Sequence, residues 1–286
     1  MNLSKCPLAL LLLAAACAPE GGRDELASCE AAGATRVAVV KTLRFARQDN
    51  PGESWGFDLD GETTESGDRG GCGVQDYTDP EGNTGIDNGF ANLIPVLELT
   101  EAGAVEPLIA SAIASGELLF MAQLSNLNDP ADDPCVDFAF ARGVGDPDLS
   151  SAGEVLPGQT FDRDPDIELV EFEDLVMVDD SLVARPFVTH VPITFFDVHL
   201  DFEIQNAAIR VIMDEDGAMH GYLGGGLDTE TLVSLAAERS SDPTLAHTIR
   251  SLLAIAADLD PGEDGVCRQI AINFEFEAVS AFFYAD

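Results

Sequence analysis

Apolar and polar residues alternate most regularly between residues 196 and 205. Phe196, Val198, Leu200, Phe202 and Ile204 are each followed by a polar or charged residue. Successive side chains of a strand point to opposite faces, so this pattern predicts an antiparallel strand with one packed and one solvated face. The same alternation predicts a strand over residues 270–276, near the end of the chain.

Shorter stretches of the same kind predict further strands. Residues 207–213 and 218–223 flank the sequence Asp-Glu-Asp-Gly, and its Asp-Gly pair favours a tight hairpin turn. Other apolar stretches rich in β-branched and aromatic residues predict strands over residues 35–47, 118–127 and 136–142.

Spacing of apolar residues at the helical period predicts four helices. Asp87 or Asn88 can cap a helix that runs towards Leu99, although Pro95 would kink or end it. Further helices are predicted over residues 105–115, 229–239 and 243–257, and Asp228 caps the one that begins at residue 229.

The elements together predict an α+β fold dominated by antiparallel sheet, with about eight or nine strands and about four helices packed on one side. No linker or repeat divides the chain after residue 30, so we expect a single domain over residues 31–286. Residues 48–88 lack an apolar period and form a long loop rich in Gly and Asp. A loop of this length inside a compact domain needs something to order it, for which a disulfide and a metal are the candidates.

The N-terminus has the pattern of an export signal. An apolar run from Leu8 to Ala16 is too short to span a bilayer and ends directly before Cys17. The sequence Leu-Ala-Ala-Ala-Cys resembles the bacterial lipobox, which implies a signal peptide over residues 1–16, lipidation of Cys17 and a polar tether over residues 17–30. An ordinary secretory signal that is cleaved after Ala16 is the alternative.

Cysteine counting favours the lipobox interpretation. With Cys6 removed and Cys17 lipidated, four cysteines remain, an even set that suits an oxidising compartment. They are Cys29, Cys72, Cys135 and Cys267, and we expect the pairs Cys29–Cys267 and Cys72–Cys135. Ala18 is not the Asp that resembles an inner-membrane retention signal, so the expected address is the outer membrane or cell surface.

Several short segments resemble a group of uncharacterised predicted lipoproteins of Gram-negative bacteria. They are Phe57-Asp58-Leu59-Asp60-Gly61, Gly71-Cys72, Gly85-Ile86-Asp87-Asn88 and Gly262-Glu263-Asp264-Gly265-Val266-Cys267. The resemblance covers most of the mature chain. It implies a lipid-anchored protein of the cell envelope and no known activity.

The chain is strongly acidic, with a formal net charge of −38. Such a charge repels nucleic acid and anionic lipid surfaces, so neither is an expected partner. It is compatible with a saline environment or with simple surface solvation. The hydrophobic fraction of 46% predicts a folded domain despite this charge.

The acidic loop holds a candidate calcium site. Carboxylates and amides stand at alternate positions in one part of the loop, as at the start of an EF-hand, and Gly residues separate them. Thr84 and Phe90 replace the turn glycine and the bidentate Glu, so the segment is not an EF-hand. The alternative is that these residues only form turns. The candidate ligands are Asp58, Asp60, Asp79, Glu81, Asn83 and Asp87. Asp258 and Asp260, with Glu263 and Asp264, form a weaker candidate.

No nucleophile, zinc or phosphate-loop motif occurs in the sequence, and the four histidines suit packing or solvent exposure. We therefore expect a non-catalytic binding or structural module at the membrane surface, with calcium as the only expected cofactor. One alternative is a carrier of an apolar ligand or lipid, and an unrecognised hydrolase is another. Seven phenylalanines could line a carrier or fill a core: Phe195, Phe196, Phe202, Phe274, Phe276, Phe282 and Phe283.

Overall fold

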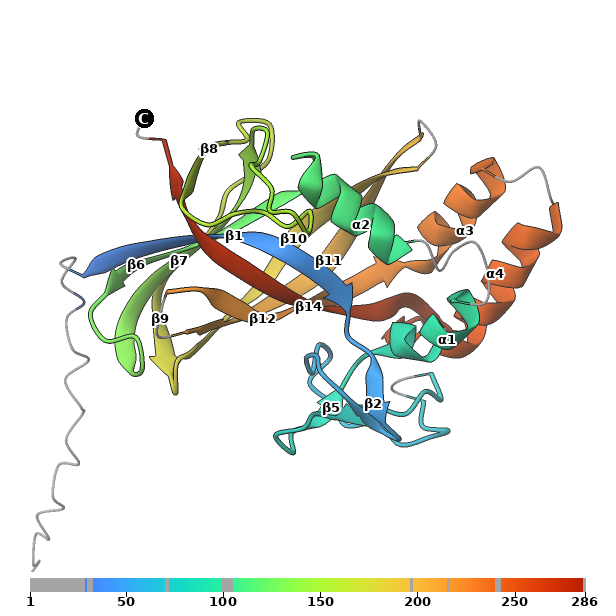
Figure 1. Ribbon diagram of the computed structural model, residues 1–286. Coiled ribbons are helices and arrows are strands. Elements are labelled where there is room, and N and C mark those ends of the chain that lie inside the picture. Colours follow the sequence, from blue (N-terminus) through green and yellow to red (C-terminus); the bar gives the residue numbers. More distant parts are fainter. Residues whose placement is uncertain are drawn as a thin grey trace, which may run out of the picture.

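A computed structural model describes residue 29 and residues 33–69, 72–98, 105–195, 198–214, 217–239 and 243–284 (Figure 1). The signal peptide, Cys17 and almost all of the tether lie outside these residues. No helix in the described ranges is both long enough and apolar enough to span a membrane.

Eight antiparallel strands close into a barrel (Figure 1). The ring closes because β1 pairs with both β6 and β14, while β7 pairs with both β6 and β9. Closure pairs each of these strands on both sides over at least part of its length. In order around the ring they are β1 (Ala34–Phe45), β6 (Leu119–Leu127), β7 (Asp133–Val144), β9 (Val170–Val178), β10 (Ser181–Phe195), β11 (Val198–Met213), β12 (Met219–Asp228) and β14 (Cys267–Phe283).

Alternate residues of each strand fill the inside of the barrel. Leu124 faces Phe138 across β6 and β7, and Met177 faces Leu182 across β9 and β10. These four side chains and Met219 are at most 1% exposed. Burying each of them contributes about 1.5–3 kcal/mol, so the apolar period of the strands is what holds the barrel together.

Helix α2 (Val105–Ala114) closes one end of the barrel. It contacts β1 and β10, which stand opposite one another in the ring, and it buries Ile109, Ala112 and Ile113. Glu106 at its start accepts a hydrogen bond from the backbone N–H of Phe45 at 3.0 Å, at the end of β1.

The other helices gather beyond the same end (Figure 1). The predicted cap of α3 (Thr229–Arg239) is confirmed, because Asp228 Oδ1 accepts the N–H of Thr231 at 2.7 Å. Helix α4 (Pro243–Ala256) packs against α3 and β14. The predicted α+β class holds in this broad sense, but the sheet is a closed barrel. The expected layer of helices over one side is instead a group at one end.

The acidic loop is largely ordered as a second small sheet. Its four short strands are β2 (Gln48–Asn50), β3 (Glu53–Ser54), β4 (Tyr77–Thr78) and β5 (Thr84–Ile86). The helix predicted towards Leu99 is a 3-10 turn, η1 (Gly89–Asn92), followed by the single turn α1 (Ile94–Leu97). Pro95 stands in the first turn of α1, where its missing N–H needs no partner.

Two short strands complete the larger sheet, and the sequence pattern did not predict several of its strands. Strand β8 (Gln159–Arg163) pairs with the end of β14 and with β7, and β13 (Leu259–Pro261) pairs with the start of β14. Strands β8, β9 and β10 were not predicted. The two strands predicted over residues 196–205 and 207–213 are one strand, β11, which is interrupted at Asn206 by a positive φ of 48°.

The predicted disulfide pairing is wrong. The bonds are Cys29–Cys135 and Cys72–Cys267. Strands β1 and β14 are antiparallel neighbours, so Cys29, before β1, and Cys267, at the start of β14, lie at opposite ends of the barrel. Cys135 is near the start of β7, at the end where β1 begins. Two disulfides indicate an oxidising, non-cytoplasmic compartment.

Candidate cation site in the acidic loop

The acidic loop is held against the outer face of the barrel wall. Arg185 Nη1 on β10 donates to the carbonyl oxygen of Asp58 at 2.8 Å, and Asn206 Nδ2 on β11 donates to that of Leu59 at 3.1 Å. The Cys72–Cys267 disulfide ties the loop to β14. These three attachments fix the backbone that carries the acidic side chains.

Three carboxylates converge in this loop. Asp58, Asp60 and Asp87 each offer one oxygen within 4.8 Å of the other two. One oxygen of each is held by a backbone N–H: Asp58 by Gly61 at 2.6 Å, Asp60 by Glu62 at 2.8 Å and Asp87 by Leu59 at 2.7 Å. The turn therefore orients the carboxylates, and each keeps lone pairs that are available to a ligand.

Asp87 is the unusual member of the group. It is 1% exposed, and its Oδ1 is buried without a hydrogen-bond partner, while its Oδ2 faces the turn at Leu59 and Asp60. Burial raises the pKa of Asp87 to about 8, and the negative charges of Asp60, Asp258 and Asp76 add to this effect. A buried, unpaired oxygen among like charges is costly unless a cation or a proton compensates it.

Neutral oxygens lie beside the carboxylates at Gly85. This glycine has a φ of +81°, and a Cβ built on it would stand 2.8 Å from the carbonyl oxygen of Glu62, 3.0 Å from Thr63 Oγ1 and 3.6 Å from the carboxyl carbon of Asp58. Calcium binds six to eight oxygens, including carboxylates and carbonyls, at about 2.3–2.6 Å. The oxygen-rich chemistry of this corner suits a hard divalent cation.

The other three predicted ligands do not belong to this group. Asp79 is 3% exposed and accepts the N–H groups of Glu81 and Asn83 at 3.0 and 2.8 Å, which makes it the organiser of a turn. Asn83 Nδ2 donates to the other oxygen of Asp79 at 2.8 Å, and Glu81 pairs with Arg210 at 3.2 Å. These residues shape the loop, as the alternative interpretation of the sequence expected.

Two supporting residues come from the far end of the sequence and were not predicted in this role. Asn273 on β14 is 1% exposed and donates from Nδ2 to the carbonyl oxygen of Asp87 at 2.7 Å. Gly224 on β12 makes room for it, because a Cβ there would stand 1.9 Å from Asn273 Oδ1. This close approach explains why the position is a glycine.

Asp258 forms a second support rather than a second ion site. It is 2% exposed, and its two oxygens accept the backbone N–H groups of Gly89 at 2.6 Å and Ala271 at 2.7 Å. Burial raises the pKa of Asp258 to about 7, although these N–H groups favour its charged form. Asp258 thereby joins the start of η1 to β14, next to the carboxylate group.

Two histidines contact carboxylates, His190 with Asp201 at 3.0 Å and His220 with Asp214 at 3.3 Å. Within the described ranges, neither imidazole hydrogen bonds to a hydroxyl or a thiol. The side chain of His199 lies outside the described part of the chain.

Comparison with known proteins adds no assignment, because no family model, curated protein or solved structure matches this chain.

Proposed function

We propose that the protein is an exported, non-catalytic binding or structural module, anchored to a membrane through Cys17, whose acidic loop is ordered by one calcium ion. The observation that carries the calcium site is the buried carboxylate of Asp87, which converges with Asp58 and Asp60 and has one oxygen without a hydrogen-bond partner. The anchor rests on the lipobox-like sequence before Cys17, and the oxidising compartment agrees with export.

Calcium is favoured over magnesium by the nature of the donors. Magnesium requires a nearly ideal octahedron and keeps several of its waters, whereas calcium accepts irregular sets of protein oxygens. The three carboxylates stand on a turn and on the residue that follows β5, so an ion between them would have an irregular set of protein oxygens. In this proposal the ion links the turn at Asp58 to Asp87, whose backbone is held by Asn273 of the barrel wall.

A thermal melt of residues 18–286, produced under oxidising conditions, tests the proposal. A ligand that binds only the native state adds about 2.7 kcal/mol to its stability at a hundred times the Kd. The melting midpoint rises as a consequence. We expect millimolar calcium to raise the midpoint by several degrees over EDTA, and magnesium at equal ionic strength to have little effect.

The double variant Asp58→Asn/Asp60→Asn should lose this calcium-dependent rise. Both side chains lie in a partly exposed turn, and Asn can keep the acceptor for Gly61 and Glu62. Glu173→Gln is the matched control, because it removes an exposed carboxylate on β9 and should keep the rise. An equal rise in all three proteins, or with any salt, would reduce the loop to solvated turns.

A further inference from the structure

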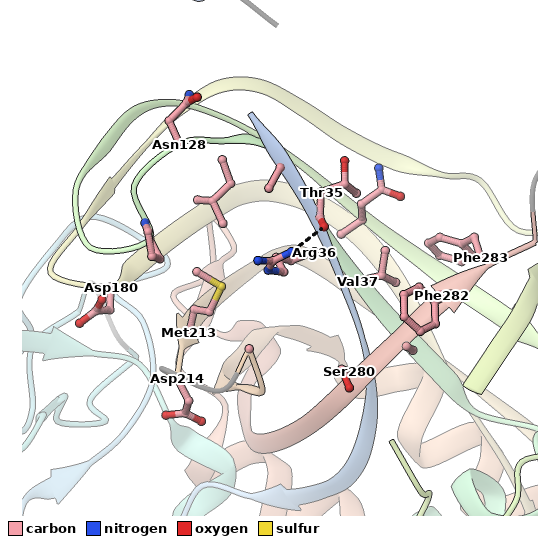
Figure 2. Close-up of a pocket in the computed structure, with 16 residues that line it drawn as sticks. Thr35, Arg36, Val37, Asn128, Asp180, Met213, Asp214, Ser280, Phe282 and Phe283 are labelled. Carbon is pink, nitrogen blue, oxygen red and sulfur yellow. Dashed lines mark hydrogen bonds between the residues drawn. The ribbon is translucent and has the colours of Figure 1, made fainter. Parts of the chain in front are cut away.

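The end of the barrel opposite α2 holds an open pocket (Figure 2). Its volume is about 770 Å³, within the range of small-molecule sites. It is surrounded by the start of β1, the end of β6, the turns that follow β9 and β11, and the end of β14. An eight-stranded barrel is just wide enough to hold one small ligand.

The pocket opens because β1 and β14 separate. Their pairing ends at Ala38 and Ser280, and beyond this pair β14 turns to join β8, so that Phe282 pairs with Thr160. Phe282 remains 57% exposed at the opening. The first residues of β1 therefore border an opening in the wall as well as the end of the barrel.

Arg36 supplies a positive charge to this pocket. It stands opposite Leu124, a fully buried residue of the barrel interior, so the register directs it inwards. Figure 2 shows its guanidinium lying across the pocket towards Met213. Among the described residues, its one hydrogen bond runs from Nη1 to the carbonyl oxygen of Thr35 at 3.5 Å, and no carboxylate lies within 4.0 Å of it.

The surroundings of Arg36 combine apolar walls with an acidic rim. Leu127, Met213 and Phe282 line the pocket with apolar surface, while Asp180 and Asp214 stand on its rim (Figure 2). A single guanidinium matches one carboxylate, which it can bind through two parallel hydrogen bonds. The two rim carboxylates disfavour a more highly charged head group.

We propose that this pocket binds a single-chain amphiphile with one carboxylate head group, such as a medium-chain fatty acid. Arg36 pairs with the carboxylate, and the chain lies against Leu127, Met213 and Phe282. This role goes beyond the calcium-stabilised module and does not depend on the cation site. Of the seven phenylalanines that could line a carrier or fill a core, Phe274 and Phe276 belong to the packed core, and Phe282 and Phe283 line the pocket.

Isothermal titration with decanoate and with decanol tests the site. The buffer contains EDTA, so the result is independent of calcium, and decanoate stays below its micelle-forming concentration. We expect saturable binding of one decanoate per chain and at least roughly tenfold weaker binding of decanol, since a charge-paired head group adds about 1.4 kcal/mol or more.

Variants separate the head-group contact from nonspecific apolar binding. Arg36→Gln should weaken decanoate binding about tenfold and leave decanol binding unchanged. Arg250→Gln, an exposed arginine on α4, is the matched control and should bind as the wild type does. Ser280→Trp places a large side chain in the pocket and should weaken both ligands, with a thermal midpoint that shows a folded protein.

Three results would overturn the proposal. They are the absence of saturable decanoate binding to the wild type, equal affinity for decanoate and decanol, and an Arg36→Gln variant that binds decanoate as well as the Arg250→Gln control does.

Discussion

Asn273 donates a hydrogen bond from its Nδ2 to the backbone carbonyl oxygen of Asp87, at 2.7 Å, across 186 residues of sequence. Both residues are 1% exposed. The backbone groups of both residues are hydrogen bonded as well. The N–H of Ala46 donates to the carbonyl oxygen of Asn273 at 2.8 Å, and the N–H of Asp87 donates to the carbonyl oxygen of Phe57 at 2.9 Å. The barrel wall thus fixes the backbone that carries the buried carboxylate of Asp87.

Asn273→Ala should lower the free energy of unfolding by about 1–3 kcal/mol, because it leaves the buried carbonyl oxygen of Asp87 without a partner. Urea unfolding in EDTA measures the loss. Asn50→Ala is the control, since its amide makes only an exposed hydrogen bond to Glu53, and it should change stability by less than about 0.5 kcal/mol. Equal losses in the two variants would show that the buried Asn273 contact contributes no more to stability than the exposed Asn50 contact does.

Sequence patterns predicted those parts of the fold that depend on near neighbours. The alternation ending at Ile204, the hairpin that pairs Met213 with Met219, and the Asp228 cap are each set by residues within a few positions of one another. Closure of the barrel depends on pairs such as Phe138 with Phe172 and Ala38 with Ser280, which no local pattern specifies. The disulfide pairing was predicted wrongly for the same reason, because no local pattern specifies which distant cysteines meet.

The candidate site divides in the same way. Asp58 and Asp60 share one turn, and Asp87 was predicted from its place in an acidic run. Asp79 belongs to that run too, but local spacing could not show that its oxygens hold a turn. The buried support from Asp258 acts across 169 residues, so its signal lies in the three-dimensional packing.

The two disulfides should have different effects on the cation site. Replacing Cys72 and Cys267 with Ser should lower stability by about 2–4 kcal/mol and also weaken the calcium-dependent rise in melting temperature, because this bond ties the loop to β14. Replacing Cys29 and Cys135 removes a bond at the other end of the barrel, so we expect a loss of stability with the calcium response intact. Melts with and without calcium compare the pairs, and a calcium response that depends equally on both bonds would contradict the assignment.

Gly85→Ala should destabilise the loop beyond the strain of its backbone. Its φ is +81°, and the added Cβ would stand 2.8 Å from the carbonyl oxygen of Glu62. Gly153→Ala is the matched control, because Gly153 has the same φ of +81° and open space around it. Each variant has the backbone strain of about 1–2 kcal/mol. Only Gly85→Ala should also weaken calcium binding, as measured by the calcium-dependent shift of the midpoint.

Asp258 should make the protein less stable as pH rises. Its pKa in the folded state is raised from 3.8 to about 7, so the stability that it contributes is present below pH 3.8 and is lost as pH approaches 7. Asp258→Asn does not titrate, but its amide can accept only one of the two N–H bonds to Gly89 and Ala271.

The wild type should therefore exceed Asp258→Asn in stability by more at about pH 5 than at about pH 8. Urea unfolding in EDTA at several pH values measures the difference between the two proteins. An advantage that grows with pH would show that the folded state favours the charged form of Asp258.

Calcium titration calorimetry of the wild type and Asp87→Asn tests the cation site most directly. This substitution keeps the size of the side chain and an acceptor for the N–H of Leu59, but it removes the charge at the buried oxygen. In a buffer with excess magnesium, we predict one calcium ion per wild-type chain and at least tenfold weaker binding to Asp87→Asn, a loss of about 1.4 kcal/mol or more. Absence of binding to the wild type, or equal binding to the two proteins, would contradict a calcium site at Asp58, Asp60 and Asp87.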